Sequence, residues 1–495
     1  MTLVQNFPAL CILLTLVCAV LTSVLKRRSA AALTGLVLMV NLVMNGMALV
    51  YTLRTGESYV YRMGHFSAPW GNELRVGVLE TGTATVLLLV VLLSYLGAYR
   101  RSSRKIEPTK YNLYGVMVDL CVLSLQALIY TNDLFTAYVF IEISTLAASG
   151  LIMARQTGRS LVAGVRYMIM NLLGSSLFLL GVVILYAITG HLLMTPIHDA
   201  VAELAASGEY RIPLDVTVAL ISVGLGMKSA LYPFEKWVPA AYSNATTTSS
   251  ALLSSVVSKG YIFLLIKIYV RTIGLPVIES LGITDVMFVF GACGMIMGSV
   301  AALRTKTVRM MIAYSSVAQI GYIFLAIGLG TMEGMMVALW HLLAHAATKS
   351  MLFVAAAEMD EASGDTHLRK DIRGAFYRSP LAALAFSLGA VNLVGLPLLS
   401  VFVTKFMMGQ TAVAVGGRHM VVTLVCLAVS TLLNLGYFMS TAMSLFIKDG
   451  ETGERRRPEP LVCLGLAGFL VLNLVLSLCA APIYQTLLSG FAVFG

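Results

Sequence analysis

Ionisable side chains interrupt several long apolar stretches of this 495-residue chain. Seven of them are one carboxylate, four amines and two imidazoles: Glu142, Lys228, Lys259, His341, His345, Lys349 and Lys405. A charge at the centre of a bilayer costs about 2.5–3.5 kcal/mol even on a lenient insertion scale, so a fold retains it only when it is paired, hydrated or functional. Carboxylates, lysines and histidines exchange protons, whereas arginine stays protonated in proteins. These residue types indicate proton transfer inside a membrane.

A carboxylate opposite a lysine forms a minimal electrostatic switch. Glu142 paired with Lys228 would stabilise the charged forms of both groups. Opening the pair would leave a desolvated lysine, which then releases its proton toward Lys259. A static ion pair between two helices is the alternative interpretation of Glu142 and Lys228.

The elements that must hold these side chains are membrane-spanning helices. The chain is 58% hydrophobic and 12% charged, whereas soluble domains carry about 25% charged residues. This composition excludes soluble, disordered and fibrous proteins. Apolar stretches of about 18 residues or more can cross a bilayer as helices. Fourteen such stretches are expected, at 8–25, 30–53, 76–99, 112–130, 134–154, 161–189, 214–232, 249–272, 283–303, 308–330, 333–357, 379–409, 420–447 and 461–485.

The distribution of basic residues predicts the orientation. With the N-terminus outside, seven cytoplasmic connections hold 22 Lys and Arg, and six outer loops hold 6. Cytoplasmic loops normally carry this excess. Clusters such as Arg455-Arg456-Arg457 are therefore predicted to be topological anchors, and the basic pI of 9.2 does not indicate nucleic-acid binding. We predict a multi-pass protein of the inner (plasma) membrane with both termini on the outer side.

The remaining charges in the spans have less specific interpretations. Arg166 and Lys267 lie near span ends, where long side chains can extend to the interface. For Asp119, a polar contact between helices is favoured over ion binding.

Two of the spans should be discontinuous helices. Pro233 and Pro239 follow Lys228, and Gly395 and Pro397 precede Lys405. Proline removes a backbone donor and clashes with the preceding turn. Broken helices near ionisable residues in corresponding positions suggest inverted repeats. The predicted organisation has four parts: helices 1–3 in 1–111, a first repeat of helices 4–8 in 112–272, a second repeat of helices 9–13 in 283–447, and helix 14 in 448–495.

Six motifs follow one another at characteristic spacing. They are Asn132-Asp133-Leu134-Phe135 leading to Glu142; Met227-Lys228-Ser229-Ala230 with Pro233-Phe234 and Trp237-Val238-Pro239-Ala240; Ser258-Lys259-Gly260-Tyr261; Ala313-Tyr314-Ser315-Ser316 with Gln319-Ile320-Gly321-Tyr322; His341-Leu342-Leu343-Ala344-His345 through Lys349; and Gly395-Leu396-Pro397-Leu398-Leu399-Ser400 with Lys405. In this order they resemble the antiporter-like subunits of respiratory complex I, Mrp-type Na⁺/H⁺ antiporters and membrane-bound energy-converting hydrogenases. The resemblance is strongest over 112–410. Glu235 departs from it, because many relatives have histidine there.

This resemblance implies a subunit that translocates H⁺, and in one branch Na⁺, through a larger complex. Protons would pass from Lys228 to Lys259, then through His341 or His345 to Lys405, the terminal lysine in the outer half of helix 12. The implied partners are other membrane subunits, including related antiporter-like subunits, and a hydrogenase or dehydrogenase module. The chain carries no cysteine cluster, nucleotide loop or haem motif, so we expect no cofactor in it. Any redox chemistry, as in an NADH-quinone oxidoreductase-like complex or an energy-converting hydrogenase, would belong to the partners.

Several alternatives stay open at this level. Lys259 could be satisfied by the hydroxyls of Ser254 or Ser255, Lys349 could join two helices, and Lys405 could extend to the outer interface. The chain could also be a stand-alone secondary transporter of a small solute or, least favoured, a membrane enzyme that uses its two histidines.

Overall fold

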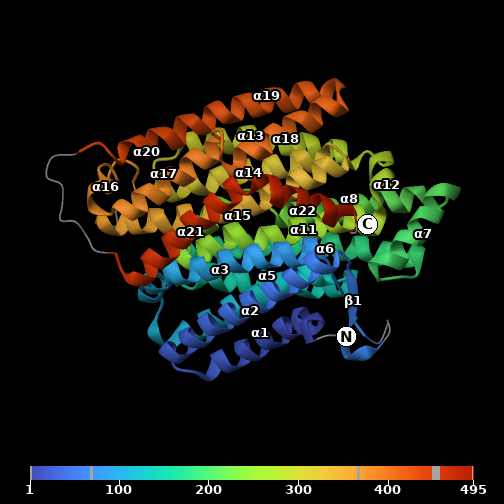
Figure 1. The fold of residues 1–495 in the computed structure, drawn as a ribbon, viewed down its shortest axis with the longest axis horizontal. Coiled ribbons are helices and arrows are strands. Elements are labelled where there is room, and N and C mark those ends of the chain that lie inside the picture. Colours follow the sequence, from blue (N-terminus) through green and yellow to red (C-terminus); the bar gives the residue numbers. More distant parts are fainter. Residues whose placement is uncertain (1–2, 67–70, 365–367, 449–457, 493, 495) are drawn as a thin grey trace.

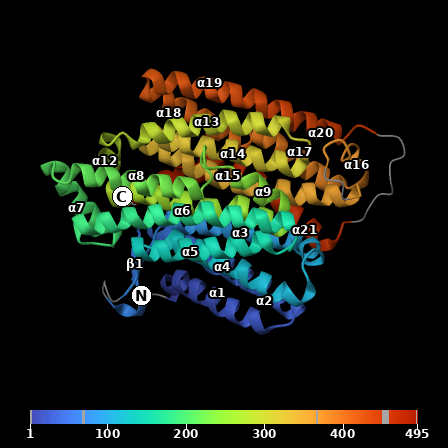
Figure 2. The ribbon, with the colours of Figure 1, turned by 180° about the vertical axis from the view of Figure 1, so that it is seen from behind.

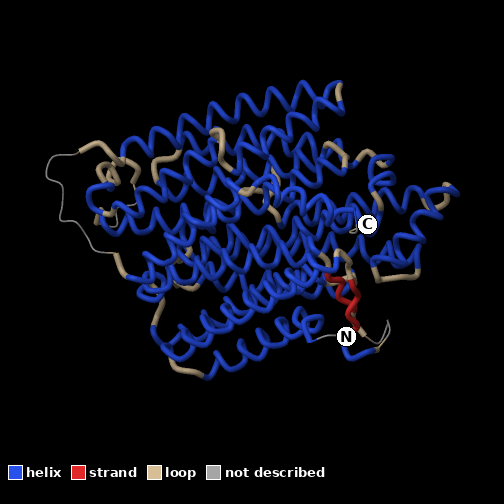
Figure 3. Tube along the Cα trace, in the orientation of Figure 1, coloured by secondary structure: helices blue, strands red, loops and turns tan. Residues whose placement is uncertain are grey.

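Long helices lie side by side along the longest dimension of the molecule (Figure 1). The computed structural model describes residues 3–66, 71–364, 368–448, 458–492 and 494. Within these ranges, 12 helices are long and apolar enough to cross a membrane, and strands occur only in one hairpin (Figure 3). The chain is therefore an all-α polytopic membrane protein, as its composition predicts. The basic cluster Arg455-Arg456-Arg457 lies outside the described residues.

The first half of the chain holds the N-terminal helices, the hairpin and the first interrupted helix. Its elements are α1 (Phe7–Val24), α2 (Arg27–Thr55), β1 (Tyr59–Arg62), β2 (Glu73–Val76), α3 (Val78–Arg104), α4 (Tyr111–Tyr130), α5 (Leu134–Met153), α6 (Gly158–Thr189), α7 (Met194–Ser207), α8 (Arg211–Lys228), α9 (Trp237–Asn244), α10 (Thr247–Leu252) and α11 (Ser258–Lys267).

The second half begins with a short helix and ends with two helices that fold back across the bundle. Its elements are α12 (Leu275–Ser280), α13 (Ile283–Arg304), α14 (Val308–Gly328), α15 (Met332–Ala362), α16 (Ala375–Arg378), α17 (Pro380–Val394), α18 (Ser400–Val415), α19 (Gly417–Asn434), α20 (Ser440–Ser444), α21 (Pro460–Leu478) and α22 (Ala480–Ala492).

The two helices expected to be discontinuous are interrupted. The first breaks between α8, which ends at Lys228, and α9. The second breaks between α17 and α18, where Gly395 adopts a φ of 82° that favours glycine. Neither expected span, 214–232 nor 379–409, is in the set of 12. The 18 residues of α8 include three charged ones, Arg211, Asp215 and Lys228, and the interruption leaves α17 and α18 with only 15 and 16 residues. The total of fourteen crossings and the inverted repeats stay predictions.

Two further helices contain three π-helical turns that the sequence did not predict. One, Leu253–Val257, joins α10 to α11; another, Ile268–Ile273, follows α11; the third, Leu435–Met439, joins α19 to α20. Such turns disturb the regular hydrogen-bond ladder and are frequent at functional sites.

The hairpin and α7 also lie outside the predicted elements. They occupy the same end of the bundle as α12 and α22, opposite the end that carries α16 (Figures 1 and 2). Met194, Ile197 and Val201 are the buried residues of α7. This spacing gives one apolar stripe, which packs against the π-helical turn at Ile268–Ile273. Fourteen residues is too short for a span, so a search for apolar stretches overlooks this helix.

Candidate ion-translocation site

The end of α8 places Lys228 inside the first half of the bundle. A Cβ on Gly174 of α6 would lie 2.8 Å from the Gly224 carbonyl oxygen and 3.1 Å from Lys228 Cγ. Only glycine therefore lets α6 and α8 approach so closely at this level. Lys228 is fully buried, and its Nζ donates to Thr145 Oγ1 of α5 at 2.7 Å and lies 5.2 Å from the Tyr261 ring centroid.

Glu142 lies on α5, one turn before Thr145. The expected direct pair is absent, because within the described residues Glu142 forms no ion pair with Lys228, although the two interact electrostatically. Glu142 Oε1 is a buried atom without a hydrogen-bond partner. The hydroxyl of Thr145 occupies the position next to the Lys228 amine where the Glu142 carboxylate was expected.

The π-helical turn between α10 and α11 positions Lys259. This lysine is fully buried, and its Nζ donates to the Ser254 carbonyl and, at 3.2 Å, to Ser258 Oγ. Ser255 Oγ donates instead to the Ala251 carbonyl. Neither hydroxyl expected as the alternative, that of Ser254 or of Ser255, contacts Lys259; the acceptors are a backbone oxygen of the turn and the hydroxyl of Ser258.

The middle of α15 carries two stacked histidines and a lysine. The rings of His341 and His345 lie 5.9 Å apart between centroids, with an interplanar angle of 1°. His341 Nδ1 is 3.1 Å from Thr404 Oγ1 of α18, whereas both nitrogens of His345 are buried without a partner. Lys349 Nζ donates to the Ile312 carbonyl, at 3.1 Å, and to Ser315 Oγ on α14. Lys349 therefore does join two helices, directly beside the histidines.

Lys405 points back toward the break between α17 and α18. Its Nζ donates to the Val394 carbonyl at 2.6 Å and to Thr431 Oγ1 of α19 at 2.8 Å. It also lies 5.6 Å from the ring centroid of Tyr322. Each of these contacts is made within the protein, so the expectation of a side chain extended to the interface is not met in this structure.

Five of the seven predicted residues lie close enough to one another to interact electrostatically. His345 interacts with Lys259 on one side and with Lys349 on its own helix. His341 interacts with the same two lysines and with Lys405. The second half of the predicted set thus forms one cluster, from Lys259 to Lys405. Glu142 and Lys228 form a separate group, which α11 joins to the cluster because it carries both Tyr261 and Lys259.

One lysine lies in a different environment from the one predicted, and one buried ion pair was not predicted. Lys267 is fully buried rather than interfacial, and its Nζ donates to the carbonyls of Ile129 and Thr131 at 3.0 and 2.7 Å. One turn further, Arg271 pairs with Glu80 of α3 at 2.6 Å, with both side chains at most 2% exposed. Charges at the end of an apolar stretch are ambiguous in sequence, because burial there depends on which other helices cover them.

Comparisons with known proteins agree with this architecture. The family described as "NADH:quinone oxidoreductase/Mrp antiporter, TM" matches residues 131–447. The chain is 33% identical to NADH-quinone oxidoreductase subunit N of Desulforudis audaxviator, over 92% of this chain and 90% of the relative. It is 26% identical to a Na(+)/H(+) antiporter subunit of Alkalihalophilus pseudofirmus, over 89% and 88%. Among solved structures, a chain of the membrane-bound sulfane sulfur reductase, an archaeal respiratory membrane complex, superposes with a TM-score of 0.87 at 26% identity, covering 98% of this chain and 97% of that one.

The range matched by the family, residues 131–447, contains both interrupted helices and the seven candidate residues. The chain therefore belongs to the NADH:quinone oxidoreductase/Mrp antiporter transmembrane family, as an antiporter-like membrane subunit.

Proposed function

We propose that this chain translocates protons as an antiporter-like subunit of a multisubunit membrane complex. The observation that carries the proposal is the row of buried basic groups from Lys259 through His345 and His341 to Lys405. Lysine and histidine exist in protonated and neutral forms. A row of such groups inside a bilayer is suited to proton transfer.

In this proposal, Glu142 controls the first lysine of the path. When Glu142 approaches Lys228, the carboxylate stabilises the charged amine. In the conformation described here, Lys228 instead contacts the hydroxyl of Thr145, which is neutral. Loss of the carboxylate favours release of the proton toward Lys259. The two states differ by a movement of side chains on α5 and α8.

From Lys259 the proton passes along α15. The unpartnered nitrogens of His345 and His341 are the points at which water can complete the path. Thr404 holds His341 beside Lys405, the proposed terminal lysine in the outer half of the membrane. Lys349 on α15 adds a basic group next to the two histidines. Its hydrogen bond to the Ile312 carbonyl connects α15 to α14.

The proposed architecture comprises two inverted repeats, residues 112–272 and 283–447. In each, an interrupted helix is followed by a helix with a π-helical turn. We further propose that both termini lie on the outer side of the inner (plasma) membrane. A cysteine placed at Glu203 on α7 should react with an impermeant reagent from outside, and one at Arg455 should not. The reverse labelling pattern would show that the orientation is wrong.

The proposed partners are other membrane subunits of one complex. The matched proteins are named as subunits of an NADH-quinone oxidoreductase and of a Na⁺/H⁺ antiporter, and the matched structure is a respiratory membrane complex. Redox chemistry or antiport in those partners would drive the path. We expect no cofactor in this chain. Copurification of a redox module would support coupling to redox chemistry. Copurification of small antiporter subunits alone would support coupling to antiport.

The test of the path is a set of charge-removing variants in the intact complex. Glu142→Gln, Lys228→Ala and Lys259→Ala should each abolish ion movement into reconstituted vesicles, while the complex purifies with all its subunits. Glu203→Gln and Lys110→Ala, which alter exposed side chains outside the path, are the controls and should transport normally. Native transport by Glu142→Gln would reject the switch, because this variant keeps the shape of the side chain and removes only its charge.

A further inference from the structure

The proposed path leaves one buried carboxylate unused, Asp119 in the middle of α4. It is 1% exposed and lies where α1, α2 and α4 meet. Three side chains from the two neighbouring helices donate to the same oxygen, Oδ2: Thr22 Oγ1 at 3.1 Å, Thr34 Oγ1 at 3.2 Å and Cys18 Sγ at 3.4 Å. A carboxylate here is satisfied by neutral donors alone.

The surroundings of Asp119 do not hold it in one protonation state. In the described part of the chain, no lysine, arginine or histidine forms an ion pair with it. Hydroxyl and thiol groups can donate to a carboxylate and accept from a carboxylic acid, so the same three partners accommodate either form. The surrounding helices carry these titratable or charged groups besides Asp119: Cys11 and Cys18 on α1; Arg27, Arg28, Tyr51 and Arg54 on α2; Glu80, Tyr95, Tyr99, Arg100, Arg101 and Arg104 on α3; Tyr111, Tyr114, Cys121 and Tyr130 on α4; and Tyr138 and Glu142 on α5.

Most of these groups are engaged elsewhere. Arg27 donates to the Ser103 carbonyl and stacks on Tyr111 at 5.5 Å. Tyr95 donates to the Ala31 carbonyl. Of the set, Cys18 and Tyr95 interact electrostatically with Asp119, and neither is a cation. Among these described residues, no fixed positive charge therefore stabilises the ionised form.

A file of buried polar side chains leads from this site along α4. Thr15, one turn from Cys18 on α1, accepts from Asn41 Nδ2 at 2.7 Å and from Gln126 Nε2 at 3.4 Å. Asn45 Nδ2 donates to Gln126 Oε1 at 3.3 Å, and Tyr130 OH donates to Asn45 Oδ1 at 2.5 Å. From residue 119 to residue 130, α4 rises about 16 Å. Hydrogen bonds connect Thr15 to Tyr130, and one turn of α1 separates Thr15 from Cys18 at the Asp119 site. Buried polar side chains spread over this length are costly in a membrane protein unless they serve a purpose.

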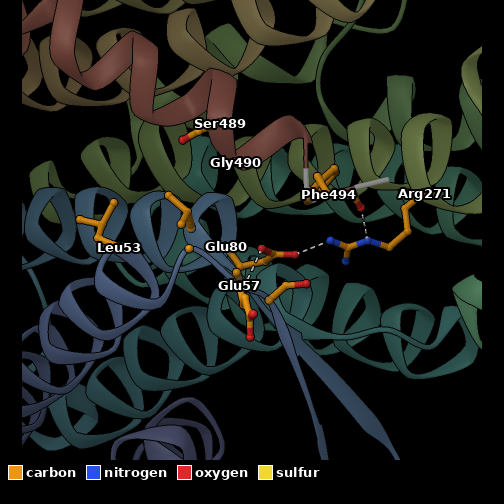
Figure 4. A pocket seen from close by; sticks show the side chains of 11 residues that line it. Leu53, Glu57, Glu80, Arg271, Ser489, Gly490 and Phe494 are labelled. Atoms are coloured by element: carbon orange, nitrogen blue, oxygen red, sulfur yellow. Dashed lines mark hydrogen bonds and ion pairs between the residues drawn. The ribbon is translucent and has the colours of Figure 1, made fainter.

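At its Tyr130 end, the file comes within electrostatic reach of a residue that lines a cavity, at the end of the molecule that carries the hairpin. Tyr130 interacts electrostatically with Glu80, and Glu80 lines a cavity of about 100 Å³ with Arg271, Phe494 and the exposed Glu57 (Figure 4). This volume is enough for several waters, each of which takes about 30 Å³ in the liquid. Arg271 Nη1 is buried there without a partner.

We propose that Asp119 is a second proton-binding site, which exchanges its proton with this cavity along the file from Thr15 to Tyr130. The site shares no residue with the proposed proton path, which runs from Glu142 and Lys228 to Lys405. It therefore does not depend on the function proposed for that path. The hydroxyls of Thr22 and Thr34 reorient when the carboxyl gains its proton. The proton moves by exchange between oxygen-bound hydrogens and water, and no covalent bond to carbon changes.

Infrared spectroscopy of the intact complex in lipid tests the proposal without relying on transport. On acidification, a carboxylic-acid C=O band should appear, shift in D₂O and be lost in Asp119→Asn. The asparagine keeps an oxygen for the same three donors, so the fold should survive. Asp119→Glu should restore a band at a shifted position. Asp199→Asn, an exposed aspartate on α7, is the control and should leave the buried band intact.

The route is tested by comparing two buried tyrosines. Tyr130→Phe should slow hydrogen–deuterium exchange of the Asp119 band several-fold, whereas Tyr95→Phe, outside the file, should not change it. Identical spectra for the parent and Asp119→Asn would overturn the proton site. A band that responds to Na⁺ at constant pH would also overturn it, in favour of a metal cation. Equal exchange rates in the two tyrosine variants would overturn the route.

Discussion

Replacing Lys405 by arginine and by methionine separates a proton carrier from a structural cation. Lys405 Nζ donates to the Val394 carbonyl at 2.6 Å and to Thr431 Oγ1 at 2.8 Å. Arginine keeps the charge and offers five donors, but it does not release a proton in proteins. Methionine has a similar length and loses both charge and donors.

The structural cost of the methionine variant follows from these contacts. Hydrogen bonds of a charged group contribute about 1.5–3 kcal/mol each, so the two are worth about 3–6 kcal/mol. Methionine also removes a charge whose placement at the bilayer centre costs about 2.5–3.5 kcal/mol. The midpoints of these two ranges, about 4.5 and about 3 kcal/mol, leave a net loss of stability of about 1.5 kcal/mol for Lys405→Met. Lys405→Arg should lose less, because the Val394 carbonyl at the end of α17 keeps a cationic donor.

Stability and proton transport should therefore respond differently to the two substitutions. Purified complexes are compared by thermal unfolding, and proton movement is followed with a pH-sensitive dye in reconstituted vesicles. Both variants should fail to transport, although only Lys405→Met is measurably destabilised. Lys110→Arg and Lys110→Met, at an exposed site, serve as controls. If Lys405→Arg transports at the native rate, Lys405 is an anchor and the proton leaves elsewhere. If Lys405→Met unfolds like the parent, the energy assigned to its contacts is wrong.

Three other predictions follow from buried contacts. Arg271→Met should destabilise the complex by about 3–5 kcal/mol, because it leaves a buried carboxylate unpaired; adding Glu80→Gln should recover most of this in thermal unfolding. Gly224→Ala should cost about 1–3 kcal/mol and impair transport, because its Cβ would lie 2.6 Å from a backbone oxygen of α6; Gly46→Ala, which meets nothing within 4 Å, should be neutral or slightly stabilising. Thr145→Val removes the hydroxyl that accepts from the buried lysine of α8, a bond worth about 1.5–3 kcal/mol; vesicle assays should show reduced transport by a fully assembled complex.

Local properties of the sequence determined the membrane fold and the candidate residues. Hydropathy over about 20 residues decides whether a segment crosses a bilayer, and this depends little on the rest of the chain. Proline and glycine act on their own turn, so the interruptions near Lys228 and Lys405 were also predictable. Ionisable residues within apolar stretches are conspicuous for the same reason, as Lys259 illustrates.

The partners of these residues were decided by the tertiary structure alone. Lys228 and Lys267 are both lysines within apolar stretches. Lys228 contacts a hydroxyl of α5, whereas Lys267 contacts the carbonyls at the end of α4. Glu142 was expected to pair directly with Lys228 and stands apart from it, and Asp119 gathers its three donors from α1 and α2. Each contact joins helices far apart in the chain. Hydropathy and helical period state which face of a helix is apolar, but the choice of neighbour depends on packing between whole helices, which no local pattern encodes.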